Sequence, residues 1–298
     1  MQWIDRSRLA SQVLAGTFLN LGSSAAVEIA AGTGFDWVLL DCEHGSGSWG
    51  DLRAQLLAVQ GTTAAPIVRV RSLNADDVKF VLDSGAAGVM FPYVADATEA
   101  ARAVSLMKYP PQGVRGVAQV IRATDYGRNW KSYLAEANEK TLVVVQIETP
   151  QAAAQAEAIA AVPGVDALFV GPMDLSVNMG HPGDFSQPAF IQNLQKVKKA
   201  MARDLIKSRH EQLRELLDKG EAEAERELPS IVEAAQQRMR EMHELIDRLM
   251  SWFDDVQRLS PETAMQRMGM GTAVTRLLDL VSSHFEYVVI DMPRTWFS

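Results

Sequence analysis

The chain has 298 residues, which is enough for one large barrel or for two domains. A hydrophobic fraction of 47% can build a core, and the net charge of −8 argues against a nucleic-acid-binding surface. No apolar run approaches a membrane span, Met1–Asp5 lacks the character of a signal peptide, and Cys42 is the only cysteine, so we expect a cytoplasmic protein with neither membrane nor nucleic acid as partner.

Short apolar runs alternate with helical stretches over residues 1–200. The expected strands are Val13–Phe18, Trp37–Asp41, Ile67–Val70, Gly88–Phe91, Leu142–Ile147 and Ala167–Val170. Ala-rich amphipathic stretches such as Ala95–Met107 and Gln151–Ala161 predict helices between them. This patterning predicts an α/β fold with a parallel sheet, and six βα units fit most of a (β/α)₈ TIM-barrel-like fold. A doubly wound sheet is the alternative, but no Gly-rich phosphate loop follows the first strand.

The composition changes after residue 200. Over residues 201–260, 24 of 60 residues are Asp, Glu, Lys or Arg, and apolar residues from Leu228 to Phe253 recur at helical spacing. We therefore expect a charged helical hairpin or coiled coil at 201–260, with Pro229 beginning its second helix. Residues 261–298 predict a helix over Thr263–Ser282 and a terminal strand. The barrel at 1–200 is thus expected to be incomplete and followed by an α-helical C-terminal segment.

Carboxylates follow the last two strands of the barrel-like region. Gln146 and Glu148 are two positions apart and so point to the same side of the strand, while Asp174 follows the next strand. Two carboxylates from neighbouring strand ends suit a hard divalent ion such as Mg²⁺ or Mn²⁺, with positions left for water and a chelating substrate. The alternative is a pair of acids that cap helix N-termini.

Arg69 ends an apolar strand, where its charge needs a partner. That partner could be a carboxylate in a structural salt bridge, or an anionic substrate or developing enolate. Arg71, two residues further on, is a competing candidate.

His44 follows Asp41 and Glu43 at the end of the second expected strand. Histidine is the side chain best suited to move a proton near neutral pH, and a neighbouring carboxylate can orient it. Cys42 lies between these acids, which disfavour a thiolate nucleophile. The strand runs before Glu148 and Asp174 contain no lysine, which favours metal-assisted enolisation over imine chemistry.

Backbone N–H groups after the sixth expected strand, in Gly171–Asp174, could hold a small carboxylate. The alternative is a plain βα turn.

Five strings, considered together, resemble the HpcH/HpaI aldolases, which are metal-dependent class II pyruvate aldolases on a (β/α)₈ barrel. The order and spacing of the strings agree with that family over residues 1–200. They are Gly34–Gly45, Pro66–Arg69, Tyr109–Gly116, Gln146–Thr149 and Gly171–Ser176.

The resemblance implies a carbon–carbon lyase that forms or cleaves a 2-keto acid from metal-bound pyruvate and an aldehyde. It implies that Glu148 and Asp174 bind the divalent ion (Mg²⁺, Mn²⁺ or Co²⁺), and that Gln146 and Arg69 hold pyruvate and its enolate. The amides around Pro172, Met173 and Asp174 would take the pyruvate carboxylate.

For the proton transfer, the resemblance implies His44 as the base, acting through water with help from Asp41. Asp83 matches an aspartate that supports this histidine in the family, across a subunit interface. A homo-oligomer is therefore expected.

The C-terminal part departs from the family, because no seventh or eighth strand is recognisable after residue 200. Its last run, Tyr287–Trp296, resembles a Walker B strand of MinD-like pilus-assembly ATPases, but no P-loop precedes it and we assign no ATPase activity. Two alternatives to an aldolase remain: an acyl-CoA carbon–carbon lyase of the same superfamily, and a catalytically inactive barrel that acts as an assembly scaffold.

Overall fold

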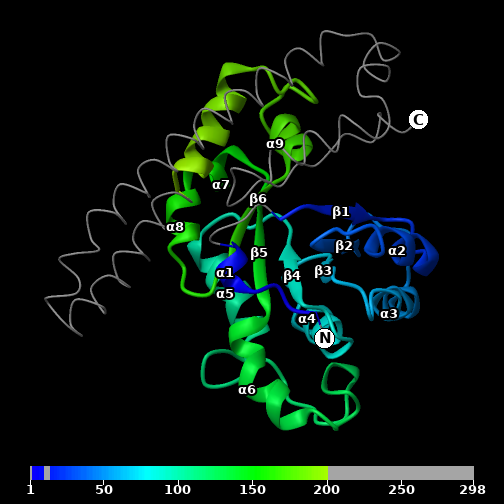
Figure 1. The fold of residues 1–298 in the computed structure, drawn as a ribbon. Coiled ribbons are helices and arrows are strands. Elements are labelled where there is room, and N and C mark those ends of the chain that lie inside the picture. Colours follow the sequence, from blue (N-terminus) through cyan, green and yellow to red (C-terminus); the bar gives the residue numbers. More distant parts are fainter. Residues whose placement is uncertain (1, 10–13, 201–298) are drawn as a thin grey trace, which may run out of the picture. The chain divides into compact units, whose positions relative to one another are not determined.

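The computed structural model describes residues 2–9 and 14–200 (Figure 1). Residues 2–6 and 15–200 belong to one compact unit, which holds all the strands given below. The segments predicted at 201–260 and 261–298 lie outside the described residues and stay predictions.

Six strands form one parallel sheet in which each strand pairs with the next along the chain. They are β1 (Gly16–Leu19), β2 (Trp37–Asp41), β3 (Ala65–Arg69), β4 (Gly88–Phe91), β5 (Leu142–Ile147) and β6 (Ala167–Val170). Helical crossovers connect them, since parallel partners cannot be joined by a tight hairpin. The helices are α1 (Arg6–Leu9), α2 (Ser24–Ala31), α3 (Trp49–Ala58), α4 (Ala75–Asp83), α5 (Ala97–Met107), the 3₁₀ turn η1 (Arg122–Thr124), α6 (Trp130–Lys140), α7 (Pro150–Ala154), α8 (Ala156–Ala160) and α9 (Pro172–Asn178).

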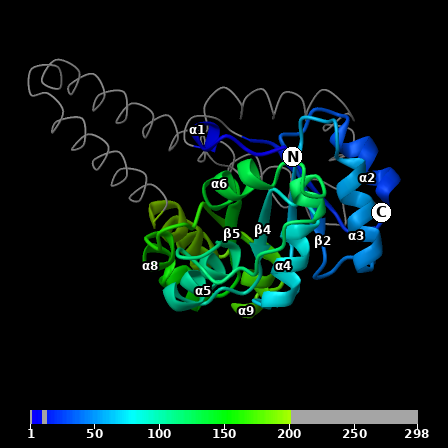
Figure 2. The same ribbon diagram turned by 90° about the horizontal axis from the view of Figure 1, so that it is seen from below.

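The sheet is curled as part of a barrel. Phe18 of β1 and Phe169 of β6 lie at opposite ends of the strand order, yet their ring centroids are 5.4 Å apart. Helices α2 to α5 and α8 lie along the outer side of the strands (Figure 2). A doubly wound sheet reverses its strand order at a switch point, whereas this order follows the sequence throughout. The predicted α/β fold with six βα units of a TIM-barrel-like sheet is therefore confirmed within residues 14–200.

The two faces of the strands have different neighbours. Val38, Leu40, Val68 and Val143 belong to the hydrophobic core, which also contains buried residues of helices α2 to α5, α7 and α8. The alternate positions of the same strands, such as Leu39, point to the inner side of the curled sheet. Residues at these inward-facing positions near the carboxyl ends of the strands therefore lie close together on the inner side of the sheet.

Most helices in the first half begin at a capping side chain. Ser23, Ser48, Asn74 and Asp96 have extended backbones, and each side chain accepts a hydrogen bond from an N–H group in the first helical turn. Such caps satisfy donors that would otherwise lack a partner within the helix. The Asp96 cap begins α5 at Ala97, close to the predicted Ala95.

The strand boundaries match the prediction at β2, β4, β5 and β6. The first strand begins at Gly16, where an added Cβ would lie 1.9 Å from the Trp37 ring. The third begins two residues early, because Ala65 donates a backbone hydrogen bond to Asp36. The single helix predicted over Gln151–Ala161 is wrong: the structure has α7 and α8, separated at Gln155.

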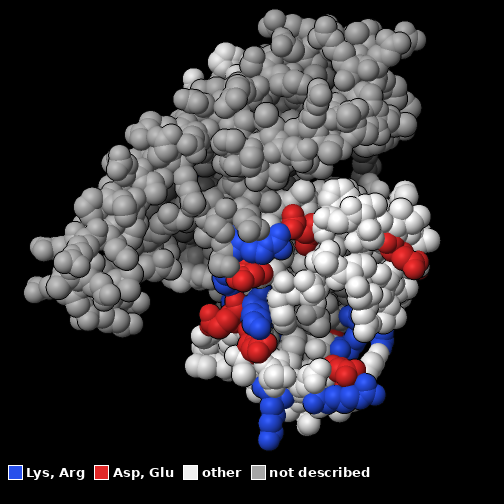
Figure 3. All heavy atoms as spheres, viewed as in Figure 1, with Lys and Arg blue, Asp and Glu red and all other residues white. Residues whose placement is uncertain are grey.

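The surface gives two further observations. None of the described helices is both long and apolar enough to cross a bilayer. Acidic and basic side chains of the described residues lie intermixed on the face shown in Figure 3.

Candidate active site

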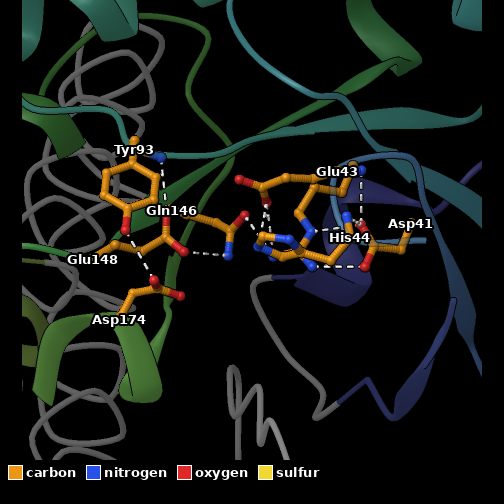
Figure 4. A network of polar contacts seen from close by, with 8 residues as sticks. Asp41, Glu43, His44, Tyr93, Gln146, Glu148 and Asp174 are labelled. Carbon is orange, nitrogen blue, oxygen red and sulfur yellow. Dashed lines mark hydrogen bonds and ion pairs between the residues drawn. The ribbon is translucent and has the colours of Figure 1, made fainter. Parts of the chain in front are cut away.

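The inward-facing ends of β2, β3 and β5 supply a buried polar cluster (Figure 4). Asp41 and Arg69 are the last residues of adjacent strands and are paired in register. Gln146 lies near the end of β5, and Glu148 follows two positions later on the same side. All four residues are buried, with exposed fractions of 8% for Asp41 and Arg69 and 1% for Gln146 and Glu148. The structure therefore brings together four residues that the sequence predicts at strand ends, and Gln146 and Glu148 share a side as their two-residue spacing predicts.

Arg69 and Asp41 form a two-pronged ion pair. Nε of Arg69 donates to Oδ1 of Asp41 at 3.0 Å, and Nη2 donates to Oδ2 at 2.7 Å. Burial raises the pKa of Asp41, but the hydrogen bonds and charge of Arg69 outweigh that effect and hold the pKa below its usual range. Arg71, the competing candidate, instead pairs with Asp77, which is not a member of the cluster.

The other side of the Arg69 guanidinium faces Glu43, which the sequence predicts beside His44 but not as a partner of Arg69. Nη1 of Arg69 lies 3.0 Å from Oε2 of Glu43 and 3.5 Å from Oε1 of Gln146. Two carboxylates therefore lie within ion-pair distance of one buried arginine. The available signal was the position of Glu43 in the same acidic strand end as Asp41.

His44 lies at the rim of the cluster, with its side chain 56% exposed. Its Nε2 is 3.8 Å from Oε2 of Glu43. Asp41 contacts His44 through the backbone, by accepting a hydrogen bond from the N–H of His44 at 3.2 Å. Asp41 thus holds the loop, and Glu43 is the carboxylate that faces the imidazole. Burial, followed by the Asp41 charge, raises the pKa of Cys42 to about 11, which agrees with its expected lack of nucleophilic character.

Glu148 is held on both of its oxygens. Nε2 of Gln146 lies 3.2 Å from Oε1, and the backbone N–H of Tyr93 donates to Oε2 at 2.7 Å. Burial raises the pKa of Glu148 to about 7; the Tyr93 hydrogen bond lowers it, and the charges of Asp174 and Glu43 raise it further.

Asp174 lies in the first turn of α9, beside Glu148. The hydroxyl of Tyr93 donates to its Oδ1 at 2.9 Å, so Tyr93 contacts both carboxylates. Sequence reasoning also missed Tyr93, although it stands two residues after β4, at the same edge of the sheet as the other strand-end residues. Pro172 and Met173 begin α9, and since proline has no N–H, only Met173 and Asp174 could offer amides to a carboxylate.

The structure does not bring Asp83 to this cluster. Asp83 ends α4, and its carboxylate accepts a hydrogen bond from Nη2 of Arg115 at 2.8 Å. A role beside His44 stays a prediction, and it would require the Asp83 of another copy.

The donor set fits a divalent ion that keeps several waters. Among the described residues, no group of three or more His, Cys, Asp and Glu side chains is arranged to hold a metal. Glu148 and Asp174 instead offer two carboxylates, and burial, followed by repulsion from the charges of Asp174 and Glu43, raises the pKa of Glu148. A cation would relieve that repulsion, and Mg²⁺ is commonly held by one or two carboxylates plus water and substrate.

Comparisons with known proteins show which family the chain matches. Residues 14–225 match the family described as HpcH/HpaI aldolase/citrate lyase. A hydroxypyruvate/pyruvate aldolase of Paraburkholderia phytofirmans is 46% identical over 60% of this chain and 71% of its own length. A 2-dehydro-3,6-dideoxy-6-sulfogluconate aldolase of Pseudomonas putida is 48% identical over 58% of this chain and 68% of its own length. A crystal structure of a family protein from Burkholderia cenocepacia superimposes with a TM-score of 0.65 at 38% identity, over 67% of this chain and 80% of that one.

Proposed function

Because the chain belongs to the HpcH/HpaI aldolase/citrate lyase family of carbon–carbon lyases, we propose that it joins pyruvate to an aldehyde, or cleaves the resulting 2-keto acid. The observation that carries the proposal is the cluster of Arg69, Gln146, Glu148 and Asp174 at one edge of the sheet. The names of the similar aldolases from Paraburkholderia phytofirmans and Pseudomonas putida support the same reaction class.

Glu148 and Asp174 would hold a divalent ion, for which Mg²⁺, Mn²⁺ and Co²⁺ are the candidates. When bound, such an ion supplies a Lewis acid that stabilises negative charge on the keto oxygen of pyruvate. Gln146 orients Glu148 through its amide nitrogen, at 3.2 Å, and so keeps one carboxylate oxygen directed into the cluster.

Arg69 would stabilise the oxygen that becomes negative when a methyl proton of pyruvate is removed. Its guanidinium is fixed in advance by Asp41 and Glu43, so it needs little rearrangement during the reaction. The N–H groups of Met173 and Asp174 would bind the pyruvate carboxylate, with Pro172 fixing the start of the helix that carries them.

His44 would accept the methyl proton through a water molecule and return it in the reverse direction. Its exposure at the rim allows water to reach the imidazole, and Glu43 faces its Nε2. Asp41 supports it through the backbone, and Asp83 would act only from a neighbouring copy in a homo-oligomer. A cytoplasmic location remains an expectation from the sequence.

The proposal is tested by incubating the protein with pyruvate and a panel of short aldehydes, with Mg²⁺, Mn²⁺, Co²⁺ or EDTA. We expect 2-keto acid products with metal and none with EDTA, and no product from Glu148→Gln. Equal turnover with and without chelator would contradict the proposal. Turnover of an acyl-CoA in place of pyruvate would instead favour the related acyl-CoA lyase, and no turnover of either substrate would favour a scaffold.

A further inference from the structure

Tyr93 is the described residue that contacts both carboxylates assigned to the metal. It stands two residues beyond β4, outside the five strings on which the family resemblance rests. Figure 4 shows its hydroxyl directed at Asp174 and its backbone nitrogen directed at Glu148. Tyr93 thus links the two carboxylates between which a metal ion would bind.

The two contacts come from different parts of Tyr93. The main-chain N–H donates to Oε2 of Glu148 at 2.7 Å, and the phenol donates to Oδ1 of Asp174 at 2.9 Å. Because Gln146 donates to Oε1 of Glu148, that carboxylate is held in one orientation from two sides. Asp174 lies on a short helix after a different strand, so the Tyr93 hydroxyl joins two separately anchored groups.

The backbone of Tyr93 is also unusual. Its φ angle is 53°, in the left-handed region that residues other than glycine rarely adopt. Non-glycine residues in this conformation persist where surrounding contacts enforce it, and they concentrate at functional sites. In this conformation the N–H group of Tyr93 contacts Glu148 and its hydroxyl contacts Asp174.

We propose that Tyr93 is a positioning residue that sets the spacing and orientation of Glu148 and Asp174 for the divalent ion. The inference rests on the proposed function, because it takes those two carboxylates as the metal ligands. Hydrogen-bond partners of metal ligands fix the ligand geometry, and their removal commonly weakens metal affinity by about 10- to 100-fold.

The test measures Mn²⁺ affinity by electron paramagnetic resonance for the wild type, Tyr93→Phe, Asp174→Asn and Tyr126→Phe. Tyr126→Phe is a matched control: Tyr126 also has a φ of 53°, and its hydroxyl accepts a hydrogen bond from Arg53, outside the cluster. We expect Tyr93→Phe to weaken Mn²⁺ binding by about tenfold or more. Tyr126→Phe should bind as the wild type does.

The melting temperature without metal shows whether each variant is folded, and the rise in melting temperature with Mn²⁺ gives a second measure of binding. If Tyr93→Phe melts early, Tyr93→Gly removes the same hydroxyl while accepting the left-handed backbone. Wild-type affinity in the Tyr93 variant, with binding lost in Asp174→Asn, would overturn this inference alone. Wild-type affinity in Asp174→Asn would overturn the metal assignment, and this inference with it.

Discussion

Arg69 and Asp41 end adjacent strands in register, and the guanidinium of Arg69 donates to both carboxylate oxygens of Asp41, at 3.0 and 2.7 Å. The side chains are only 10% and 2% exposed. The guanidinium of Arg69, which we propose stabilises the enolate, therefore also belongs to a buried ion pair. Removing Asp41 is expected to lower both the stability of the fold and the rate of the reaction.

Asp41→Ala is expected to lower the free energy of unfolding by about 3 kcal/mol, because it leaves a buried arginine with only Glu43 as its carboxylate partner. Urea unfolding measures the change. Glu136→Ala, which breaks an exposed pair with Lys140, is the control and should cost no more than about 0.5 kcal/mol. A cost for Asp41→Ala as small as that of the control would show that the pair is not buried as described.

Gly171→Ala should weaken metal binding while the protein stays folded. A Cβ at Gly171 would lie 2.7 Å from Cγ and 2.8 Å from Oε1 of Glu148, a residue only 1% exposed that has little room to move. Titration with Mn²⁺ checks the prediction, with Gly50→Ala as the control because its added Cβ would meet only the Ser48 hydroxyl, at 3.5 Å. Unchanged affinity in Gly171→Ala would argue against Glu148 as a ligand.

Metal binding should depend on pH through Glu148. The metal-free carboxyl has a pKa of about 7, raised first by burial, so below that pH a proton must leave before the ion can bind. The affinity for Mg²⁺ should rise by up to tenfold per pH unit as the pH approaches about 7, and then level off. Calorimetry in buffers of different ionisation enthalpy measures the released proton. Binding that releases no proton at pH 6 would contradict this account.

The fold and the inner members of the site follow from features that a sequence displays directly. Apolar runs that end in polar residues predict that Asp41, Arg69, Gln146 and Glu148 meet at the carboxyl edge of a parallel sheet, and the two-residue spacing of Gln146 and Glu148 predicts that these two share a side. The break between α7 and α8 at Gln155 could not be predicted, because alanine-rich sequence on both sides favours a continuous helix.

The outer members depend on the path of loops, which periodicity does not describe. Glu43 reaches Arg69 because Asp41 accepts hydrogen bonds from the N–H groups of Glu43 and His44 and so bends the loop. Tyr93 reaches Glu148 from a left-handed conformation that tyrosine seldom adopts. Asp83 was grouped with the site by resemblance, but in the described chain it ends α4 and pairs with Arg115.

The central claim is that this cluster removes a proton from pyruvate with the help of a divalent ion. The most direct measurement is deuterium exchange into the methyl group of pyruvate in heavy water, followed by proton NMR, with no aldehyde present. We expect exchange with Mg²⁺, none with EDTA, and none in Glu148→Gln. Exchange that persists with EDTA, or no exchange from folded protein that binds Mg²⁺, would contradict it.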